Sequence, residues 1–382
     1  MVLEGLAQAS GPGVGPVSRR QGLAGGPALR VFYCGYHNPR YSTVTEYTER
    51  ALSRAGAELR VADFRAFRLP GRVHRWVPAL AVWDRARLNR ALLAQVARDR
   101  ADVFVSHWNL NVFADTWAAI RRRGIPTVCQ FLDYPGEPGY IEAAERCGGQ
   151  FDHFFCQSTD VLERMRVAGH TRGSLLPVAA DPEFHFPVPI DGAGKERWGA
   201  EVAFVGSFYP ERAELLRAFT GFRLGIWGPG WAECLSRRDQ LRPFLRGGGL
   251  RPEEWRRVYA AADIVISLTG SGGKRFPADK VYQVSPRTFE VLACGGFYLV
   301  ERKRDLESLF QDRTHLVMFD STAEAVELAR QYLREPEARR RIARRGREHV
   351  LARHTYDHRA REMLAVFRRL LVASARPAGA AS

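Results

Sequence analysis

Long hydrophobic runs are absent from this sequence. No stretch approaches the roughly 18 consecutive apolar residues of a membrane-spanning helix. Cysteine is also scarce: the six cysteines form no Cys-x-x-Cys pair, and none lies near histidine at the spacing of a zinc site. Most of them sit in apolar runs, so we expect buried free thiols in a reducing cytosol rather than disulfides.

Lysine is nearly missing, although the chain is strongly basic. Only four of the 57 basic residues are lysines, and 42 acidic residues leave a net charge of +15. Such a charge suits an arginine-rich solvated surface, and it also suits nucleic acid, anionic lipid or a phosphorylated substrate. Because no nucleic-acid-binding motif accompanies the charge, we expect no nucleic-acid partner.

The remaining composition is that of an ordinary globular protein. The chain has 382 residues, of which 46% are hydrophobic and 26% charged, and this length predicts two domains. Residues 1–28 are rich in glycine, alanine and proline and lack the apolar core of a secretory signal. We therefore expect a disordered tail there.

Short apolar runs alternate with helical patterns along most of the chain, which is typical of parallel βαβ units. The predicted strands are Leu29–Tyr33, Leu59–Phe64, Val103–Ser106, Thr127–Phe131, His153–Cys156, Ser174–Leu176, Val202–Val205, Arg223–Trp227, Ile264–Leu268, Phe297–Val300 and His315–Phe319.

The alternation predicts an α/β fold with two Rossmann-like, doubly wound domains that face a cleft. The N-terminal domain spans 29–178 and the C-terminal domain 201–350, with a linker rich in proline and glycine at 179–200. A helix at 351–375 is expected to cross back to the N-terminal domain. Because strand carboxyl ends would face the cleft from both sides, we expect the ligand there.

Two strand ends of the C-terminal domain could meet a phosphate. The first runs into Gly206 and Ser207 before a helix that carries Arg212 in its first turn. Free N–H groups at a helix start favour anions. The second strand runs into Gly228-Pro229-Gly230, where the backbone can approach a partner closely. Taken alone, both segments are more typical of ordinary turns.

The most informative segment lies at 284–297. Ser285 and Pro286 begin a short helix, and Gly295 and Gly296 follow it before the next strand. Glu290 is a carboxylate in an otherwise apolar stretch and needs partners; ribose hydroxyls would be suitable donors. The alternative is an internal ion pair with Arg287, one helical turn away.

Further candidates lie in loops after predicted strands. Lys274 belongs to a basic, glycine-rich loop at 269–281 that could close over phosphates, although it lacks the spacing of a P-loop. In the N-terminal domain His37, His107 and Asp133 each follow a strand and could form an acceptor site with a general base. Each of these side chains could instead be structural.

The arginine-rich stretch from Arg334 to Arg369 has helical periodicity. It could be a solvated helical surface or could contact an anionic membrane.

Several of these segments together resemble one family. The run from Pro286 to Gly296, the later Arg353-His354-Thr355-Tyr356-Asp357-His358-Arg359-Ala360, and the strand ends at 204–207 and 228–231 resemble group 1 GT-B glycosyltransferases. The resemblance is closest to the CgeB-like, spore-protein-type branch. It covers about residues 180–365 well and 29–180 weakly.

The resemblance implies a bacterial, cytoplasmic hexosyltransferase, at most peripheral at the inner face of the membrane. The donor would be a nucleotide sugar, used with retention; no other cofactor and no metal would be needed, since the sequence has no Asp-x-Asp. The acceptor could be a glycan, a lipid, a protein or a metabolite.

Within that resemblance, each site has a role. Glu290 matches the second glutamate of the family's Glu–seven residues–Glu motif and would hold the ribose, whereas Tyr282 stands in place of the first glutamate. Arg212 and Arg287, with Lys274, would hold the diphosphate. The Tyr282 departure keeps open a second interpretation, a non-catalytic protein that binds a nucleotide or a glycan.

Overall fold

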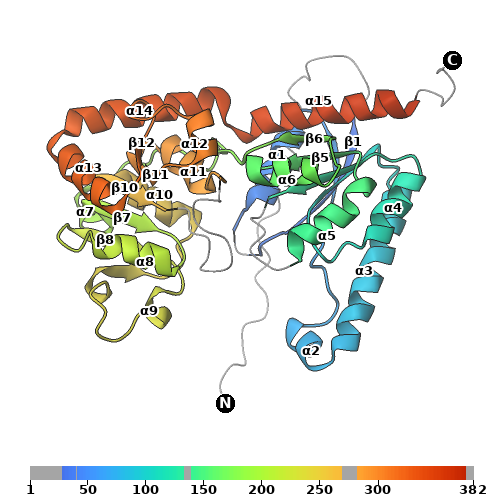
Figure 1. Cartoon of the computed structure of the whole chain (residues 1–382), viewed down its shortest axis with the longest axis horizontal. Helices are drawn as coiled ribbons and strands as arrows, with labels where there is room; N and C mark the ends of the chain where they lie inside the picture. Colours follow the sequence, from blue (N-terminus) through green and yellow to red (C-terminus); the bar gives the residue numbers. More distant parts are fainter. Residues whose placement is uncertain (1–27, 40, 133–138, 269–281, 376–382) are drawn as a thin grey trace.

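The computed structural model describes residues 28–39, 41–132, 139–268 and 282–375, which form two α/β domains side by side (Figure 1). The N-terminal sheet has six parallel strands in the order β2-β1-β3-β4-β5-β6. They are β1 Arg30–Gly35, β2 Glu58–Asp63, β3 Val103–His107, β4 Thr127–Phe131, β5 His153–Cys156 and β6 Gly173–Leu175.

The C-terminal sheet also has six parallel strands, in the order β12-β11-β10-β7-β8-β9. They are β7 Val202–Val205, β8 Leu224–Trp227, β9 Leu245–Gly247, β10 Ile264–Ser267, β11 Tyr298–Glu301 and β12 Val317–Phe319. The central strands are buried along their whole length, as expected for parallel sheets covered by helices on both faces.

Helices connect the strands in sequence order. In the described chain they are α1 Val44–Arg54, α2 Gly71–Trp76, α3 Pro78–Arg98, α4 Ala114–Arg122, α5 Tyr140–Cys147, α6 Thr159–Val167, α7 Gly192–Trp198, α8 Pro210–Arg217, α9 Trp231–Cys234, α10 Pro252–Ala261, α11 Pro286–Ala293, α12 Arg304–Leu309, α13 Thr322–Arg334, α14 Pro336–Arg353 and α15 Tyr356–Ala375.

Strand order reverses once in each sheet, and these points fix where a ligand can enter. In the N-terminal sheet the reversal lies between β1 and β3, and in the C-terminal sheet between β7 and β10. Helices that leave neighbouring strands to opposite faces open a crevice at the carboxyl ends there. The candidate residues after β1, β3 and β7 therefore lie at the two reversal points.

The last two helices link the domains. Helix α14 packs on the C-terminal domain, where Gly346 allows a close approach: a Cβ there would lie 2.2 Å from the His315 carbonyl oxygen. The helix ends at His354, whose carbonyl accepts from the Ala180 N–H at 3.0 Å. The chain then continues as α15, whose apolar face joins the N-terminal core beside α1 (Figure 1).

Most predicted strands agree with the observed ones to within one or two residues, and β4, β5 and β7 agree at both ends. The sequence did not predict the three-residue strand β9 or the short helix α2. Part of the predicted linker is helix α7, capped by the Asp191 side chain, which accepts from the Gly194 N–H at 2.7 Å. Helix α3 begins ten residues earlier than the predicted start at Leu88.

Candidate functional site

Two glycines bring the carboxyl ends of β7 and β8 together. Gly228 has a φ of +146°, and a Cβ there would lie 1.9 Å from the carbonyl oxygen of Gly206. The same Gly206 oxygen accepts from the indole N–H of Trp231 at 2.8 Å. Gly228 is therefore fixed by a steric requirement, and Gly206 leaves the end of β7 without a side chain.

Arg212 extends from the first turn of α8 across the reversal point of the C-terminal sheet. Its Nε donates to the carbonyl of Leu268 beyond β10 at 3.2 Å, and a terminal nitrogen donates to the carbonyl of Ser207 beyond β7 at 2.9 Å. Burial and the nearby Arg287 lower the pKa of Arg212 to about 10. The group is still charged at neutral pH, and an anion beside it would relieve both effects.

Arg287, on α11, approaches the same glycine turn after β7. Ser285 caps α11 by accepting from the Arg287 N–H at 3.3 Å, and the Arg287 Nε donates to the hydroxyl of Tyr259 at 3.1 Å. Its terminal nitrogen would lie 3.0 Å from a Cβ at Gly206. Burial disfavours the charge, but Tyr259 and Glu290 outweigh it and raise the pKa of Arg287. Two guanidinium groups thus converge on the glycine turn after β7.

Glu290 lies one turn further along α11. Burial raises the pKa of its carboxyl group, and Arg287 partly offsets that effect. Within the described chain, no hydrogen bond or direct ion pair engages this carboxylate. The internal ion pair with Arg287, the alternative that the sequence allowed, does not form.

Glu290 also acts electrostatically on tyrosines outside its own sheet. Its charge helps to raise the pKa of Tyr47 on α1 and of Tyr356 on α15, although burial is the main cause for both. The carboxylate therefore lies within electrostatic range of α1 and α15.

His107 ends β3 in a buried hydrogen-bonded group. Its Nε2 lies 2.7 Å from the hydroxyl of Tyr33, which donates to Oε1 of Gln130, also at 2.7 Å. Because that hydroxyl proton goes to Gln130, Nε2 of His107 is the donor toward Tyr33. Burial and the neighbouring His37 lower the pKa of His107 to about 3, so the imidazole is neutral at pH 7.

His37 follows β1 and has the opposite electrostatic setting. Its Nε2 lies 2.8 Å from Oε1 of Glu49 on α1, and this contact raises the pKa of His37 despite partial burial. Its side chain is about a quarter exposed, at 27%. The sequence did not identify Glu49, although Glu49 lies on α1 three residues beyond Glu46, which caps that helix.

Contacts between α12 and α6 join the two domains. Asp305 on α12 accepts from the backbone N–H of Thr159 at 2.8 Å and from its hydroxyl at 2.5 Å, at the start of α6. Arg304 of α12 forms an ion pair with Glu163 of α6 at 3.2 Å. Arg304 also lies over the ring of Tyr282, 5.3 Å from its centroid, so Tyr282 contacts this interdomain bridge.

Not every predicted site residue comes together. Gly295 and Gly296 precede β11, so they lie where the strands of the sheet begin. Gly206 and Gly228 lie at the opposite end, where the strands finish. Gly295 ends α11 with a φ of +79° and packs near Pro187 of the linker. The prediction that they share one nucleotide site with Gly206 and Gly228 is wrong, because the amino and carboxyl ends of parallel strands are separated by the length of the strands. Asp133 and Lys274 lie outside the described residues.

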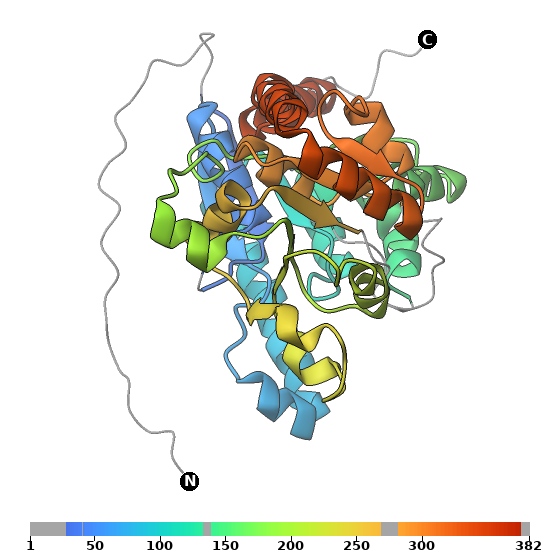
Figure 2. The ribbon, with the colours of Figure 1, turned by 90° about the vertical axis from the view of Figure 1, so that its left-hand side faces the viewer.

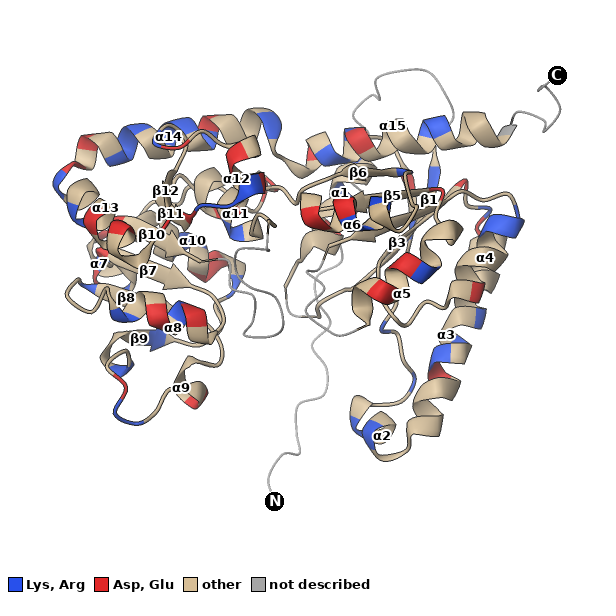
Figure 3. Ribbon diagram, in the orientation of Figure 1, with Lys and Arg blue, Asp and Glu red and all other residues tan. Residues whose placement is uncertain are grey.

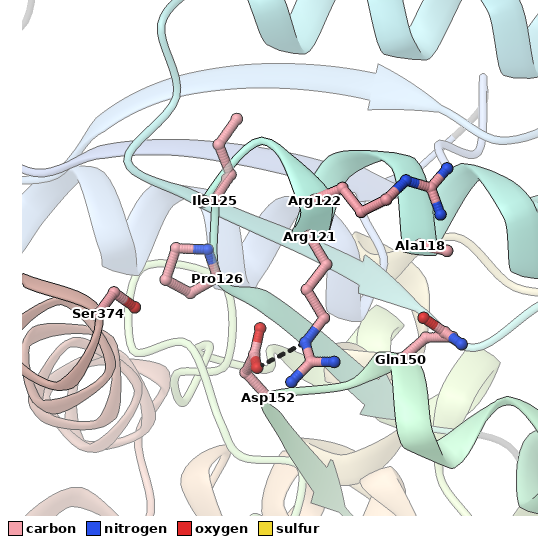
Figure 4. Close-up of a pocket in the computed structure, with 9 residues that line it drawn as sticks. Ala118, Arg121, Arg122, Ile125, Pro126, Gln150, Asp152 and Ser374 are labelled. Atoms are coloured by element: carbon pink, nitrogen blue, oxygen red, sulfur yellow. Dashed lines mark hydrogen bonds and ion pairs between the residues drawn. The ribbon is translucent and has the colours of Figure 1, made fainter. Parts of the chain in front are cut away.

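Two cavities lie at the amino ends of the strands, one in each domain, away from Gly206 and Gly228. One of about 360 Å³ lies at the amino edge of the N-terminal sheet, where Arg121 pairs with Asp152 at 2.9 Å (Figure 4). The other, of about 490 Å³, lies between Gly295–Gly296 and the arginines of α14. Arg339 there is engaged by Asp263 at 2.7 Å and Arg347 by the Ala293 carbonyl at 3.2 Å.

The described part of the chain has no cluster of metal-binding side chains: its His, Cys, Asp and Glu residues form no group of three or more that could hold a metal ion. None of its helices combines the length and hydropathy needed to cross a membrane.

Comparison with known proteins links this geometry to one class. Residues 211–365 match the family model described as glycosyl transferase-like, a range that includes Arg212, Arg287 and Glu290. A search of curated protein sequences finds no significant match.

Solved structures resemble nearly the whole chain. Sucrose-phosphate synthase from Thermosynechococcus elongatus has a TM-score of 0.70 at 13% identity, covering 90% of this chain and all of that one. HepE from Anabaena, solved with UDP and glucose, has a TM-score of 0.60 at 10% identity, with coverage of 89% and 100%. AviGT4, a glycosyltransferase involved in avilamycin A biosynthesis, has a TM-score of 0.55 at 16% identity, with coverage of 90% and 98%.

These likenesses confirm the predicted fold class. The chain has the GT-B fold, with two Rossmann-like domains of six parallel strands each and a helical C-terminus. Its C-terminal half contains a glycosyl transferase-like domain.

Proposed function

We propose that this protein is a glycosyltransferase that moves a sugar from a nucleoside-diphosphate donor to an acceptor hydroxyl. One observation carries the proposal: Arg212 and Arg287 converge on the glycine turn after β7, and one turn further along α11 the carboxylate of Glu290 accepts no hydrogen bond from the described residues. The two cations suit a diphosphate and the carboxylate suits ribose hydroxyls. The glycosyl transferase-like domain over 211–365 supports the same assignment.

In the transfer, the acceptor oxygen bonds to the anomeric carbon while the bond from that carbon to the diphosphate oxygen breaks. The nucleoside diphosphate leaves with the bonding electrons, and the acceptor proton passes to a base or to the leaving group. Arg212 and Arg287 would stabilise the negative charge that develops on the leaving oxygen. This positive charge is the reason to propose transfer without a divalent cation.

The N-terminal domain would hold the acceptor. His37, whose imidazole is tied to Glu49 and partly exposed, is the group proposed to exchange a proton, together with Asp133. Neutral His107 would orient the acceptor or the sugar, because its Nε2 already serves Tyr33. Retention of configuration, a hexose as the transferred sugar and membership of the CgeB-like branch are proposed from the sequence resemblance.

Binding of nucleoside diphosphates tests the donor site. In calorimetric titrations with UDP, GDP, ADP and TDP, each with magnesium or with EDTA, we expect one diphosphate to bind and to bind equally well in EDTA. Arg212→Ala should weaken that binding about tenfold or more, since it removes a charge-assisted contact. Arg217→Ala is the matched control on the same helix, because Arg217 is engaged by Asp239 at 2.9 Å away from the turn.

Glu290→Ala tests the ribose contact. It should cost about 1.5–3 kcal/mol of donor binding, as for hydrogen bonds to a charged group. Unchanged affinity in a folded Glu290→Ala protein would contradict this assignment.

A second candidate is a non-catalytic binder on the same fold. Tyr282 favours it, because the ring stacked near Arg304 replaces a carboxylate of the resembled motif. Tight diphosphate binding with neither donor hydrolysis nor transfer to any acceptor would support this candidate over the enzyme.

A further inference from the structure

The hairpin of α2 and the first turns of α3 exposes an unusual group of apolar side chains. Four of the ten large hydrophobic residues that are exposed in the described chain lie within residues 76–83: Trp76, Val77, Val82 and Trp83. Trp76 is 87% exposed and Trp83 43%. Isolated exposed apolar residues are normal, but a contiguous patch with two tryptophans marks an interaction surface.

The patch is a second apolar face on a helix whose first face is already buried. Helix α3 packs Leu88, Leu92 and Val96 into the N-terminal core. Ala79, Val82 and Trp83 lie at helical spacing on the outer side and are exposed. A surface helix normally carries polar residues there, so this apolar face stays exposed within the described part of the chain.

The charge around the patch has one sign. Residues 64–98 hold a single carboxylate and eight arginines: Arg65, Arg68, Arg72, Arg75, Arg85, Arg87, Arg90 and Arg98. Figure 3 shows the basic residues on α2. Arg72, Arg75 and Arg90 are exposed.

The single carboxylate is used inside the hairpin. Asp84 is fully buried and accepts from the backbone N–H groups of Arg68 and Leu69 at 3.0 and 2.9 Å. His74 and Arg87 contact it as well, at 3.2 and 3.1 Å. Asp84 therefore fixes α2 against α3, and no negative charge of this segment reaches the surface.

The hairpin also projects from the body of the molecule. In Figures 1 and 2 it forms the lowest part of the N-terminal domain, and the chain between α9 and β9 lies toward the same edge of the C-terminal domain. That connection carries exposed Arg237 and Arg238. A flat anionic surface below the molecule could therefore meet basic side chains of both domains.

From these observations we infer that the α2–α3 hairpin docks the protein on an anionic lipid surface. Trp76 and Trp83 would enter the headgroup region, where tryptophan is favoured, and Arg72 and Arg75 would contact lipid phosphates. An acidic protein partner is the alternative occupant, since tryptophan and arginine are also enriched at protein interfaces, and the vesicle experiment below decides between the two. The inference does not rest on the proposed function, because it concerns a surface outside the candidate site.

The arginine-rich stretch from Arg334 to Arg369 is a weaker candidate for the same role. The apolar face of α15 is buried on the N-terminal core, so it cannot insert. Several of its arginines are engaged within the protein, as Arg359 is by the carbonyl of Pro177 at 2.7 Å. This segment supplies the control variant below.

Co-sedimentation of the full chain with lipid vesicles tests the inference. Vesicles of phosphatidylcholine with about 30% phosphatidylglycerol should bind the protein, and binding should fall with added salt, whereas phosphatidylcholine alone should bind it weakly. Arg72→Glu with Arg75→Glu should reduce binding about tenfold or more. Arg341→Glu with Arg345→Glu changes the net charge equally on exposed positions of α14 and should have a much smaller effect.

A second pair of variants tests the apolar contact. Val82→Asp should reduce vesicle binding about tenfold. Val167→Asp, at a valine that is 89% exposed on α6, should not. Circular dichroism and thermal melting would establish that all four proteins are folded, and calorimetry with the diphosphate would establish that the candidate site is intact.

Three outcomes would overturn the inference. The wild-type protein could fail to bind anionic vesicles at low salt. The two α14 substitutions could reduce binding as much as those on α2. Finally, the chain could self-associate through the patch, in which case Val82→Asp would dissociate the oligomer in sedimentation equilibrium and leave vesicle binding unchanged.

Discussion

Arg212 and Arg287 hold two positive charges near each other at the end of β7. Such an arrangement is unfavourable by itself, and the lowered pKa of Arg212 reflects both its burial and the repulsion from Arg287. Hydrogen bonds to the carbonyls of Ser207 and Leu268 keep Arg212 in place. An anion that enters between the two groups therefore meets a preorganised site and gains more than it would in water.

Gly228, beside this pair of arginines, should tolerate no side chain. Gly228→Ala should destabilise the protein by about 3 kcal/mol or more, because its φ of +146° is strained for alanine and a Cβ would lie 1.9 Å from the Gly206 oxygen. Urea denaturation measures the loss. Gly221→Ala, which meets no atom within 4 Å, should change stability by about 0.5 kcal/mol or less. Equal stability of the two variants would contradict the steric argument.

Local pattern predicted some of the candidate residues that the structure brings together and missed others. Arg212, Arg287 and Glu290 were identified because each follows a strand end or a capped helix start, and those signals are local. The pairing of His37 with Glu49 was missed, because it depends on the angle at which α1 leaves β1. Gly295 and Gly296 were wrongly assigned to the nucleotide site, because a glycine beside a helix looks the same in the sequence whether it lies at the amino or the carboxyl ends of the strands.

Among the helices, α15 makes its core contacts with segments that lie far from it in the sequence. Met363, Leu364 and Phe367 lie far along the chain from β1 and α1 but share their core. The core of the N-terminal domain therefore includes the end of the chain.

Phe367→Ala should destabilise the N-terminal domain by about 3–5 kcal/mol, since the ring is fully buried and its loss leaves a cavity. Val372→Ala on the same helix, 60% exposed, should be close to neutral. Hydrogen exchange of the β1 and β3 amides would report the difference. If those amides exchange at the wild-type rate in folded Phe367→Ala, α15 does not stabilise that core.

Sequence periodicity predicted most strands but failed at the start of α3. The Leu88–Arg98 part was recognised from its buried apolar positions, whereas the preceding turns carry apolar residues on the solvent side as well. With apolar residues on two faces, the helical period is obscured. The part of α3 that the sequence did not reveal is thus the part that supports the inferred lipid contact.

For the whole molecule, buried histidines should dominate the response to mild acid. Burial lowers the pKa to about 3 in His107, His185 and His354 and to about 4 in His153, from an ordinary value of 6.5. The unfolded chain therefore takes up protons below pH 6.5 that the folded chain refuses, so stability is complete above that pH and falls below it. His37, with its raised pKa, acts in the opposite direction. So do four carboxyl groups whose pKa burial raises: Asp160, Asp181, Glu290 and Asp305. His315 and His358, whose pKa burial lowers, act in the same direction as the four histidines and offset part of this opposing effect.

Between pH 6.5 and 5.5 we expect the free energy of unfolding to fall by about 3–4 kcal/mol, at roughly 1 kcal/mol for each of the four histidines. Thermal melts at several pH values would measure it. His185→Asn removes one titrating group and should reduce the fall by about a quarter. A melting temperature that stays constant over this range would contradict the prediction.

The sequence alone determined the strand and helix alternation, the two-domain fold and the three charged residues near the end of β7, because these depend on neighbours within a few turns. The tertiary structure decided which edge of the sheet each glycine occupies, which imidazole is neutral and which is tied to a carboxylate, and that α15 completes the first core. It also decided that Trp76 and Trp83 stay outside. These features depend on the packing of segments far apart in sequence, and burial, which sets both pKa and exposure, exists only once that packing has formed.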